Sequence, residues 1–315
     1  MNDRKIAFLL MCGLVILWGM DYVFAKTALE VLEPMNLLFL KYSTGFLLLL
    51  VLKLKLDRKN FVRLKDIPLF ILCSITGEIL YFFCEYTAMD YIPVSLITII
   101  LAFVPAVSIL TEKIIFKRDF SVKMAIGVIM CIAGVMIVIG ADFRELLNGK
   151  LIGYLLAFGA VISWNIYNFI TERMGSDYSG VTLTFTQLCC TALLIMPYAL
   201  HTMPPTESFT PGVIGGIIYL GLGSAGIGFF ITVNSLKVLG PTISAMFSNF
   251  LPVTATFFGW LFLDQVVGIS QLLGGVVVII SSCIVIIEKG KMEEKNNDRE
   301  AEPDDADGFL RNNHG

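Results

Sequence analysis

The chain has 315 residues, of which 56% are hydrophobic and 16% are charged, and its mean hydropathy is +0.79. Soluble globular domains carry about a quarter charged residues and fewer apolar ones, so this composition excludes a water-soluble globular protein. The formal net charge of −3 says little, because the positive charges are sorted by position along the chain. No nucleic-acid partner is expected.

Apolar residues lie in ten blocks, each about 20 residues long. A helix that rises ~1.5 Å per residue needs about this length to cross a ~30 Å hydrocarbon layer. The connections are short and leave almost no chain for a soluble domain. The sequence therefore predicts an all-α membrane protein with ten transmembrane helices, at about 6–25, 34–52, 67–87, 94–115, 122–141, 151–171, 181–200, 212–235, 241–262 and 266–287.

Basic residues are concentrated in every second connection. The alternate connections hold only Lys26, Arg144 and Lys150. Basic residues accumulate on the cytoplasmic side of membrane proteins, so the N-terminus is predicted to be cytoplasmic, and ten crossings return the C-terminus to the same side. The basic connections contain Arg4, Lys5, Lys53, Lys55, Arg58, Lys59, Arg63, Lys65, Lys113, Lys117, Arg118, Lys123, Arg173 and Lys237.

The first two apolar blocks each contain a charged residue. Asp21 lies in the outer third of the first block, within LWGMDYVFAK, and Lys41 lies seven residues in from the outer end of the second. The helical rise puts both roughly 8–10 Å below the outer surface. Two interpretations are open: the residues pair, or each extends separately to the near interface.

The third apolar block carries two carboxylates on one helix face. Glu78, Tyr81, Phe82 and Glu85 are spaced i, i+3, i+4 and i+7. A carboxylate in hydrocarbon costs several kcal/mol, so Glu78 must face a partner or a water-filled cavity. It either serves a transported solute or only bonds a neighbouring helix. Glu85 lies near the outer end, where simple exposure to solvent is an equal alternative.

Two prolines interrupt corresponding blocks of the two halves. Pro105 lies inside the fourth block and Pro252 inside the ninth, and proline removes a backbone hydrogen bond and kinks a helix. Paired interruptions of this kind indicate the binding site of a carrier, with both prolines as hinges. The alternative is that both kinks only shape the packing.

The second half contains neutral polar residues within its apolar blocks. These side chains contact either a substrate or a neighbouring helix, and both interpretations stay open. They are Asn165, Tyr167, Asn168, Gln187, Asn234, Ser248 and Asn249. By contrast, Gly127 and Gly134 of the fifth block, and Gly274 and Gly275 of the tenth, predict close helix packing.

The first half of the chain is repeated in the second. A shift of 147 residues places Phe82 on Phe229 and Pro105 on Pro252 without a gap, and a shift of 146 places Trp18 on Trp164. Each half has five predicted spans, and since five is odd the second half enters the membrane from the opposite side. The halves are therefore predicted to be inverted repeats, an arrangement that gives alternating access a physical basis.

The chain resembles the EamA-type ten-helix permeases of the drug/metabolite transporter superfamily. The resemblance spans nearly all of both halves and rests on LWGMDYVFAK (17–26), EYTAMDYIPVSLITIILAFVP (85–105), GYLLAFGAVISWNIYNFITERMG (153–175), SLKVLGPTISAMFSNFLPV (235–253) and GGVVVIISSCIVI (274–286). It implies one EamA-like five-helix repeat at 1–141 and another at 151–287, joined by an extracytoplasmic link at 142–150. Residues 288–315, which are charged and poor in apolar residues, are predicted to be a disordered cytoplasmic tail.

The resemblance also implies a central cavity, which the first, third, fourth, sixth, eighth and ninth helices line in the family. Two positions depart from the family pattern: Lys41 replaces an arginine common in the second helix, and either Glu112 or Asp119 fills the place of an acidic residue near the cytoplasmic end of the fourth. The substrate-binding residues carried over are Trp18, Tyr22, Glu78, Tyr81, Phe82, Phe103, Trp164, Asn168, Asn234 and Asn249. The charges expected to take part in coupling are Glu78, Glu85, Asp21 and Lys41.

The function expected from these features is secondary active transport of a small organic metabolite or drug across the prokaryotic cell membrane. An exporter coupled to a proton or sodium gradient is favoured, acting as a monomer or homodimer. The alternatives are a non-transporting sensor or scaffold and an intramembrane enzyme. The sequence argues against the enzyme, because it has neither a histidine–carboxylate metal motif nor a nucleophile elbow, and it has no P-loop. No cofactor, metal site or catalytic residue is expected.

Overall fold

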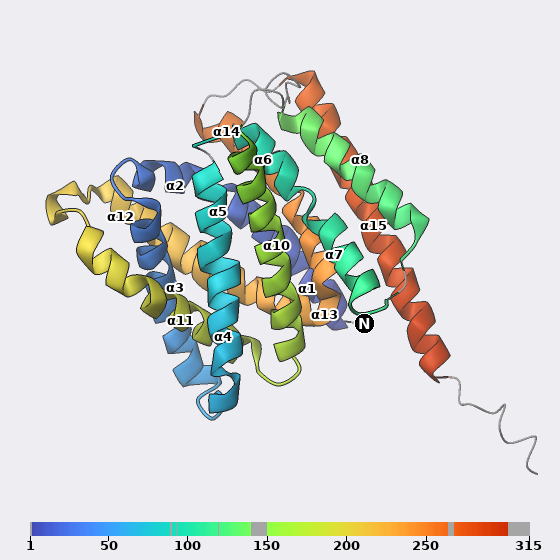
Figure 1. Ribbon diagram of the computed structural model, residues 1–315, viewed down its shortest axis with the longest axis horizontal. Helices are drawn as coiled ribbons and strands as arrows, with labels where there is room; N and C mark the ends of the chain where they lie inside the picture. Colours follow the sequence, from blue (N-terminus) through green and yellow to red (C-terminus); the bar gives the residue numbers. More distant parts are fainter. Residues whose placement is uncertain are drawn as a thin grey trace, which may run out of the picture.

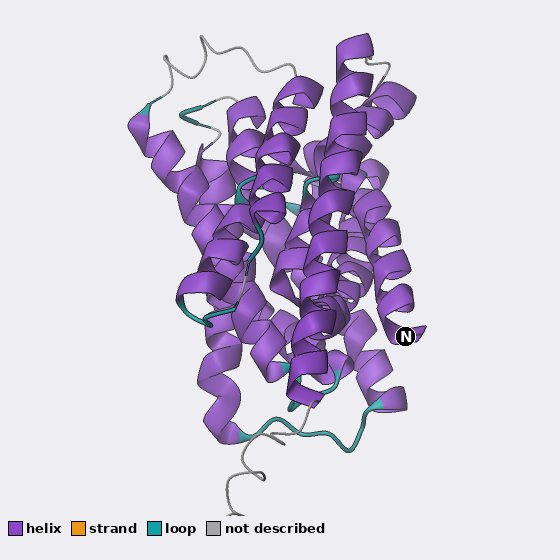
Figure 2. Cartoon of the chain, turned by 90° about the vertical axis from the view of Figure 1, so that its right-hand side faces the viewer, coloured by secondary structure: helices purple, strands orange, loops and turns teal. Residues whose placement is uncertain are grey.

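The computed structural model describes residues 2–301 except 89, 93, 119, 140–149 and 264–267, and in this part of the chain every regular element is a helix (Figures 1 and 2). The first-half helices are α1 (Asn2–Gly19), α2 (Asp21–Leu29), α3 (Pro34–Leu56), α4 (Ile67–Cys73), α5 (Tyr81–Ala88), α6 (Val94–Leu101), α7 (Val104–Ile114) and α8 (Val122–Ile139). The second-half helices are α10 (Leu151–Met174), α11 (Gly180–Thr202), α12 (Pro211–Ile218), α13 (Phe229–Ser248), α14 (Leu251–Leu263) and α15 (Ile269–Ala301). Two π-helical segments, η2 (Ser74–Leu80) and η4 (Tyr219–Gly228), join α4 to α5 and α12 to α13.

Seven helical segments of the described residues are long and apolar enough to cross a membrane. They are Asp3–Leu29, Pro34–Leu56, Leu64–Ala88, Leu151–Met174, Gly180–Thr202, Pro211–Ser248 and Ile269–Met292. The shortfall of three has local causes. The predicted fourth span is divided into α6 and α7, and α13 runs through the boundary between the predicted eighth and ninth spans. The predicted fifth span appears only as a shorter apolar helix, Val122–Val138. The count of ten stays a prediction.

Helices at equivalent positions of the two halves pack against each other. The pair α8 and α15 lies along one side of the bundle, and α3 packs against α11 on the other (Figure 1). The close helix packing predicted at these glycines is confirmed, and it lies between α8 and α15. A Cβ added to Gly274 would lie 2.9 Å from the Gly134 carbonyl oxygen and 2.7 Å from the Val138 backbone nitrogen. Any larger side chain would separate these two backbones.

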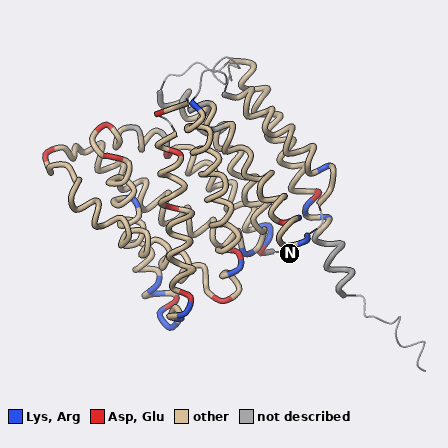
Figure 3. Tube along the Cα trace, in the orientation of Figure 1, with Lys and Arg blue, Asp and Glu red and all other residues tan. Residues whose placement is uncertain are grey.

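The described helices have a basic end and an end where few basic residues lie. Figure 3 shows Lys and Arg gathered at the end where the N-terminus lies, including the connection between α3 and α4. That connection contacts the one between α10 and α11: Arg63 and Asp66 bond Tyr178, and Arg63 also pairs with Asp177. The contact therefore ties the first half to the second at the basic end.

The predicted helix interruptions are present. The fourth predicted span breaks at residues 102–103, and α7 begins with Pro105 in its first turn. The equivalent break at Asn249–Phe250 precedes α14, which has Pro252 in its first turn. Since proline lacks the backbone N–H that the first turn leaves unpaired, both prolines begin a helix instead of bending one. A third break lies at Gly240, whose φ of +76° is a left-handed conformation that favours glycine.

The predicted disordered tail does not begin at residue 288, because α15 continues to Ala301. Lys289 is buried and donates to the Glu112 carboxylate of α7, and Ser121 donates to Glu288 at 2.9 Å. These two contacts give the charged sequence after Ile287 partners that composition alone does not reveal. Residues 302–315 lie outside the described part of the chain.

Candidate functional site

An aromatic cluster joins the two halves of the chain where α1, α5, α10 and α13 meet. Trp164 of α10 contacts four other rings, at centroid distances of 6.4 Å to Trp18, 5.0 Å to Tyr81, 5.1 Å to Tyr167 and 6.3 Å to Phe229. Tilted and edge-on contacts of this kind contribute about 1 kcal/mol each. Three of the predicted substrate-binding residues, Trp18, Tyr81 and Trp164, therefore lie together.

Lys41 lies beside this cluster and is paired. Its Nζ is 3.4 Å from Asp21 Oδ2, and Ser224 of η4 also donates to that oxygen. The ammonium group lies 5.1 Å from the centroid of the Phe82 ring, close enough for a cation–π contact. Of the two interpretations left open for Asp21 and Lys41, the structure shows the pairing, and Phe82 takes part as the aromatic partner of the cation.

Glu78 is fully buried and only half satisfied. Thr191 of α11 donates to its Oε2, whereas Oε1 has no hydrogen-bond partner among the described residues. The Tyr42 hydroxyl and Asp21 Oδ1 are also buried without a partner in that part of the chain. Leaving buried polar atoms unpaired costs about 1–3 kcal/mol each, which makes this group of oxygens a candidate contact for a ligand or a proton.

The backbone around Glu78 is π-helical, which the sequence does not predict. A shift of 147 residues places Ser74–Leu80 inside the second π-helical segment, Tyr219–Gly228, so both halves widen at the same point. Gly77 lies against the ring of Tyr167, and a Cβ there would be 2.3 Å from that ring. Short π-helical segments are frequent at functional sites, which supports placing the candidate site here.

The Asp21–Lys41 pair has a neutral counterpart in the second half. A shift of 146 residues places Asp21 on Tyr167 and Lys41 on Gln187. The Tyr167 hydroxyl donates to Gln187 Oε1 at 3.4 Å, and Gln187 Nε2 donates to the Thr171 hydroxyl at 3.0 Å. Equivalent positions are thus in contact in both halves, while the charged pair belongs to the first half.

The two helix breaks contact each other. Asn249 Nδ2 donates to the carbonyl oxygen of Ala102, at 3.4 Å, and lies 3.2 Å from Cys131 Sγ. Ala102 and Asn249 are 147 residues apart and occupy equivalent positions of the two halves. Asn249 therefore bonds a backbone carbonyl group that the break leaves unpaired. Of the two interpretations left open for this residue, this contact supports the one in which it bonds a neighbouring helix.

Other predicted site residues lie outside the aromatic cluster. Phe103 packs on Phe158, at a centroid distance of 6.1 Å, and Asn234 donates to the Phe230 carbonyl at 2.7 Å within its own helix. Asn168 is buried, and its Oδ1 has no partner among the described residues. Glu85 is 6% exposed, so simple solvent exposure is wrong for this residue. The side chain of Tyr22 lies outside the described residues.

Glu112 connects three helices near the basic end of the bundle. Besides Lys289 of α15, it accepts a hydrogen bond from Thr242 of α13 at 2.9 Å and lies 3.7 Å from Arg118. Glu112, one of the two candidates for the acidic residue near the end of the fourth span, is buried. Asp119, the other candidate, lies outside the described residues.

Several residues of this region were not among the predicted site residues. Tyr42, Thr191 and Ser224 carry no separate signal, because a tyrosine, a threonine or a serine inside an apolar block is common. Phe229 could have been found, since the shift of 147 places it on Phe82. Tyr167 and Gln187 were identified only as buried polar residues.

The sequence matches the model of the EamA-like transporter family twice, over residues 5–140 and 151–287. The chain belongs to this family. It is similar to the uncharacterized transporter YvbV of Bacillus subtilis, with 23% identity over 88% of this chain and 90% of the relative. It is also similar to an uncharacterized transporter of Archaeoglobus fulgidus, with 22% identity over 89% and 96%. Protein PecM of Dickeya dadantii is 24% identical over 67% of this chain and 68% of its own length.

The fold is also that of a solved structure. A crystal structure matches with a TM-score of 0.73 and 17% identity, over 90% of this chain and 98% of the other. Together with the apolar helices, the family assignment makes the chain a multi-pass membrane transporter of the prokaryotic plasma membrane. A family of transporters also agrees with the expectation that the protein is not an enzyme.

Proposed function

We propose that this EamA-family protein is a secondary active transporter that exports a small organic metabolite or drug by alternating access, driven by an ion gradient. The observation that carries the proposal is Glu78, a fully buried carboxylate with one unpartnered oxygen beside an aromatic cluster. The rings of Trp18, Tyr81 and Trp164 hold the apolar part of the solute. Glu78 binds the coupling ion or a cationic group of the solute.

Two features of the packing support alternating access. Helices α3 and α11 pack together, as do α8 and α15, and each pair occupies equivalent positions of the two halves. A pseudo-two-fold axis in the membrane plane brings such symmetry mates together, as expected for ten spans in two inverted repeats. The basic end of the bundle lies on the cytoplasmic side, with both termini.

Charge balance at the site supports coupling through Glu78. Lys41 is already paired with Asp21 and lies over Phe82, so its positive charge is balanced without Glu78. A buried carboxylate that keeps one oxygen free is favourable only when a proton or a cation accompanies it. Loss of the accompanying ion on one side of the membrane and its return on the other couples the carrier to the gradient.

The test compares Glu78→Gln with Glu207→Gln, a control at an exposed glutamate of the α11–α12 connection. Cells that express wild-type protein or either variant at equal membrane levels are compared for metabolites released into the medium. Solutes enriched by the wild type are then tested in proteoliposomes under proton and sodium gradients. We expect wild type and Glu207→Gln to transport, and Glu78→Gln to lose gradient-driven flux while still inserting.

Two results would contradict the proposal. Full gradient-driven flux by Glu78→Gln would show that Glu78 takes no part in coupling transport to the ion gradient. Binding of a released solute without flux in any gradient would favour a sensor over a transporter.

A further inference from the structure

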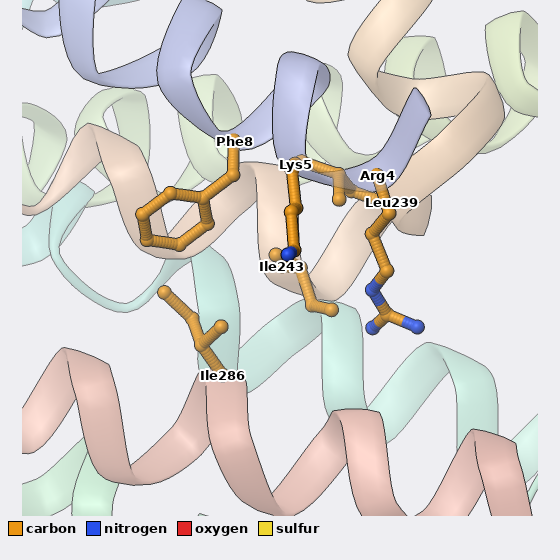
Figure 4. Close-up of a pocket in the computed structure, with 6 residues that line it drawn as sticks. All are labelled: Arg4, Lys5, Phe8, Leu239, Ile243 and Ile286. Carbon is orange, nitrogen blue, oxygen red and sulfur yellow. The ribbon is translucent and has the colours of Figure 1, made fainter. Parts of the chain in front are cut away.

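Glu78 and Thr191 form a closed contact between the two halves of the chain. Thr191 of α11 donates to Oε2 of Glu78, in η2, and both side chains are fully buried. Neither residue lines the cavity of about 370 Å³ in Figure 4, which lies between α1, α13 and α15. Because both side chains are fully buried, solvent and solute reach Glu78 only when the packing between the halves changes.

Small apolar residues occupy the place of this contact in the other copy of the repeat. A shift of 146 residues places Gly45 on Thr191. A shift of 147 residues places Glu78 on Ala225. Gly45 and Ala225 also face each other, since a Cβ added to Gly45 would lie 3.0 Å from the Ala225 Cβ. Packing of these helices therefore requires neither a carboxyl nor a hydroxyl group at this place.

The Thr191 hydroxyl group has two acceptors within reach. Besides Glu78 Oε2, it lies 3.0 Å from the carbonyl oxygen of Gln187, one helical turn earlier. A hydroxyl group has a single proton, so it donates to one of these oxygens at a time and accepts through its own lone pairs. The Gln187 carbonyl also accepts from Ser74 at 2.9 Å, so it stays bonded when Thr191 turns to Glu78.

We infer that Thr191 is the positioning residue that lets Glu78 exchange a proton, a role that rests on the proposed coupling function of Glu78. With Glu78 ionised, Thr191 donates to its Oε2. After Glu78 takes one proton from water, its new O–H donates to Thr191 Oγ1, and the Thr191 hydroxyl donates to Gln187. Thr191 itself gains and loses no proton, and the coupling ion is a proton. Without this hydroxyl group, both states would bury the carboxyl group unpaired.

The other titratable groups around Glu78 leave this exchange to Glu78 itself. Lys41 is paired with Asp21, and Glu85 lies about two helical turns away. The remaining groups are thiols and phenols, which carry no charge at neutral pH. Among the described residues they are Tyr42, Cys73, Tyr81, Tyr86, Tyr167 and Cys190.

The first test uses full-length protein in lipid nanodiscs, with the proton alone as the ligand. Infrared difference spectra between acidic and alkaline buffer give the C=O band of protonated Glu78, which is identified by its loss in Glu78→Gln. Because a hydrogen bond lowers the frequency of this band, we expect Thr191→Val to raise it. Thr191→Ser keeps the hydroxyl group and should leave the band in place. Thr191→Cys, whose thiol is a weaker donor, should shift the band part of the way.

The matched control is Thr184→Val, at a fully buried threonine of the same helix. The Thr184 hydroxyl donates to the Gly180 carbonyl at 2.9 Å, so the control removes the same kind of bond within α11. The second test measures flux in proteoliposomes under a proton gradient, with a solute released by wild-type cells as the probe. We expect flux to fall about tenfold in Thr191→Val, to be mostly retained in Thr191→Ser and to be unchanged in Thr184→Val.

The outcomes separate this role of Thr191 from the proposed function. Equal band positions and equal flux in Thr191→Val and Thr184→Val would overturn the role of Thr191 and leave coupling through Glu78 intact. A wild-type spectrum without a band that Glu78→Gln abolishes would also overturn it, as would flux driven by a sodium gradient and not by a proton gradient. Full flux by Glu78→Gln would instead contradict the proposed function itself.

Discussion

Asp21 and Lys41 show how a charged pair is tolerated among apolar helices. Lys41 is 6% exposed, and its charge is balanced by Asp21, with Ser224 as a further donor to the carboxylate and Phe82 beneath the ammonium. At the equivalent positions of the second half, Tyr167 and Gln187 form a hydrogen bond of 3.4 Å between neutral groups. The fold therefore accepts a neutral pair at this place in the second half. Packing alone does not require the charges that Asp21 and Lys41 carry in the first half.

Breaking the Asp21–Lys41 pair should be more harmful than removing both charges. Lys41→Gln leaves the partly buried Asp21, one of whose oxygens is fully buried, with Ser224 as its remaining donor. Removal of one partner from a buried pair costs about 3 kcal/mol. The double variant Asp21→Asn/Lys41→Gln imitates the neutral pair of the second half and should recover most of the lost stability. Thermal unfolding in detergent measures both variants. A double variant that is less stable than Lys41→Gln would contradict the argument.

At the scale of single residues, the sequence predicted how deep a side chain lies in the membrane, but it predicted few of the partners that the side chain contacts. Counting helical rise from the block ends placed Asp21 and Lys41 at one level, and the two residues do pair. No such count could identify Thr191 as the donor to Glu78, because the two residues are 113 positions apart and meet only through the packing of η2 against α11. Partner identity across helices depends on the crossing geometry, which a single sequence does not contain.

At the scale of elements, the breaks were predicted and the π-helical segments were not. Proline at 105 and 252 changes the local backbone chemistry, so its position is visible in the sequence. The π-helical segments contain SITGEIL and YLGLGSAGIG, which are compatible with an ordinary helix, and their widening depends on close neighbours such as Tyr167 against Gly77. Tertiary packing therefore decided the form of these two segments.

The connection between α3 and α4 is held to α11 through Asp57. Ser179, which caps α11, and Thr182 both donate to Asp57 Oδ2, and Lys53 Nζ lies 3.4 Å from the same oxygen. Burial opposes ionisation of Asp57, but the hydrogen bonds from Ser179, Thr182 and Asn60 outweigh it, so its pKa lies below the usual value. The ionised carboxylate therefore favours the contact between the two halves.

This depressed pKa predicts a dependence of stability on pH. A carboxyl group with a lowered folded pKa contributes stability above its unfolded value of about 3.9, and this contribution is lost as pH falls through the folded pKa. Asp57→Asn should therefore unfold at a lower temperature than wild type at pH 6, and the difference should shrink as pH is lowered from about 4 to 3. Melting curves in detergent across this range measure it. Asp90→Asn, at an exposed site, should show no such trend; an Asp57→Asn difference that is constant with pH would contradict the assignment.

At the scale of the whole molecule, the two halves are similar in how their helices pack, but the C-terminal part of α15 departs from this similarity. Helices α8 and α15 occupy equivalent positions and pack along their lengths, and α15 continues to Ala301, whereas α8 is described only as far as Ile139. The extension brings Lys289 to Glu112, which also accepts from Thr242 of α13. Composition predicted disorder from residue 288 because charge dominates there, and it could not show that one lysine has a buried partner.

Lys289 should therefore stabilise the whole bundle, although it lies in a charged segment. Lys289→Met removes a buried countercharge from Glu112, and Arg118 at 3.7 Å replaces it only in part, so the expected loss of stability is about 2 kcal/mol. Lys291→Met, which changes an exposed lysine two residues further on, is the matched control and should be neutral. Glu112→Gln/Lys289→Met should recover part of the loss, because neither charge is then left alone. Equal melting temperatures for Lys289→Met and Lys291→Met would show that α15 adds nothing to the bundle beyond Ile287.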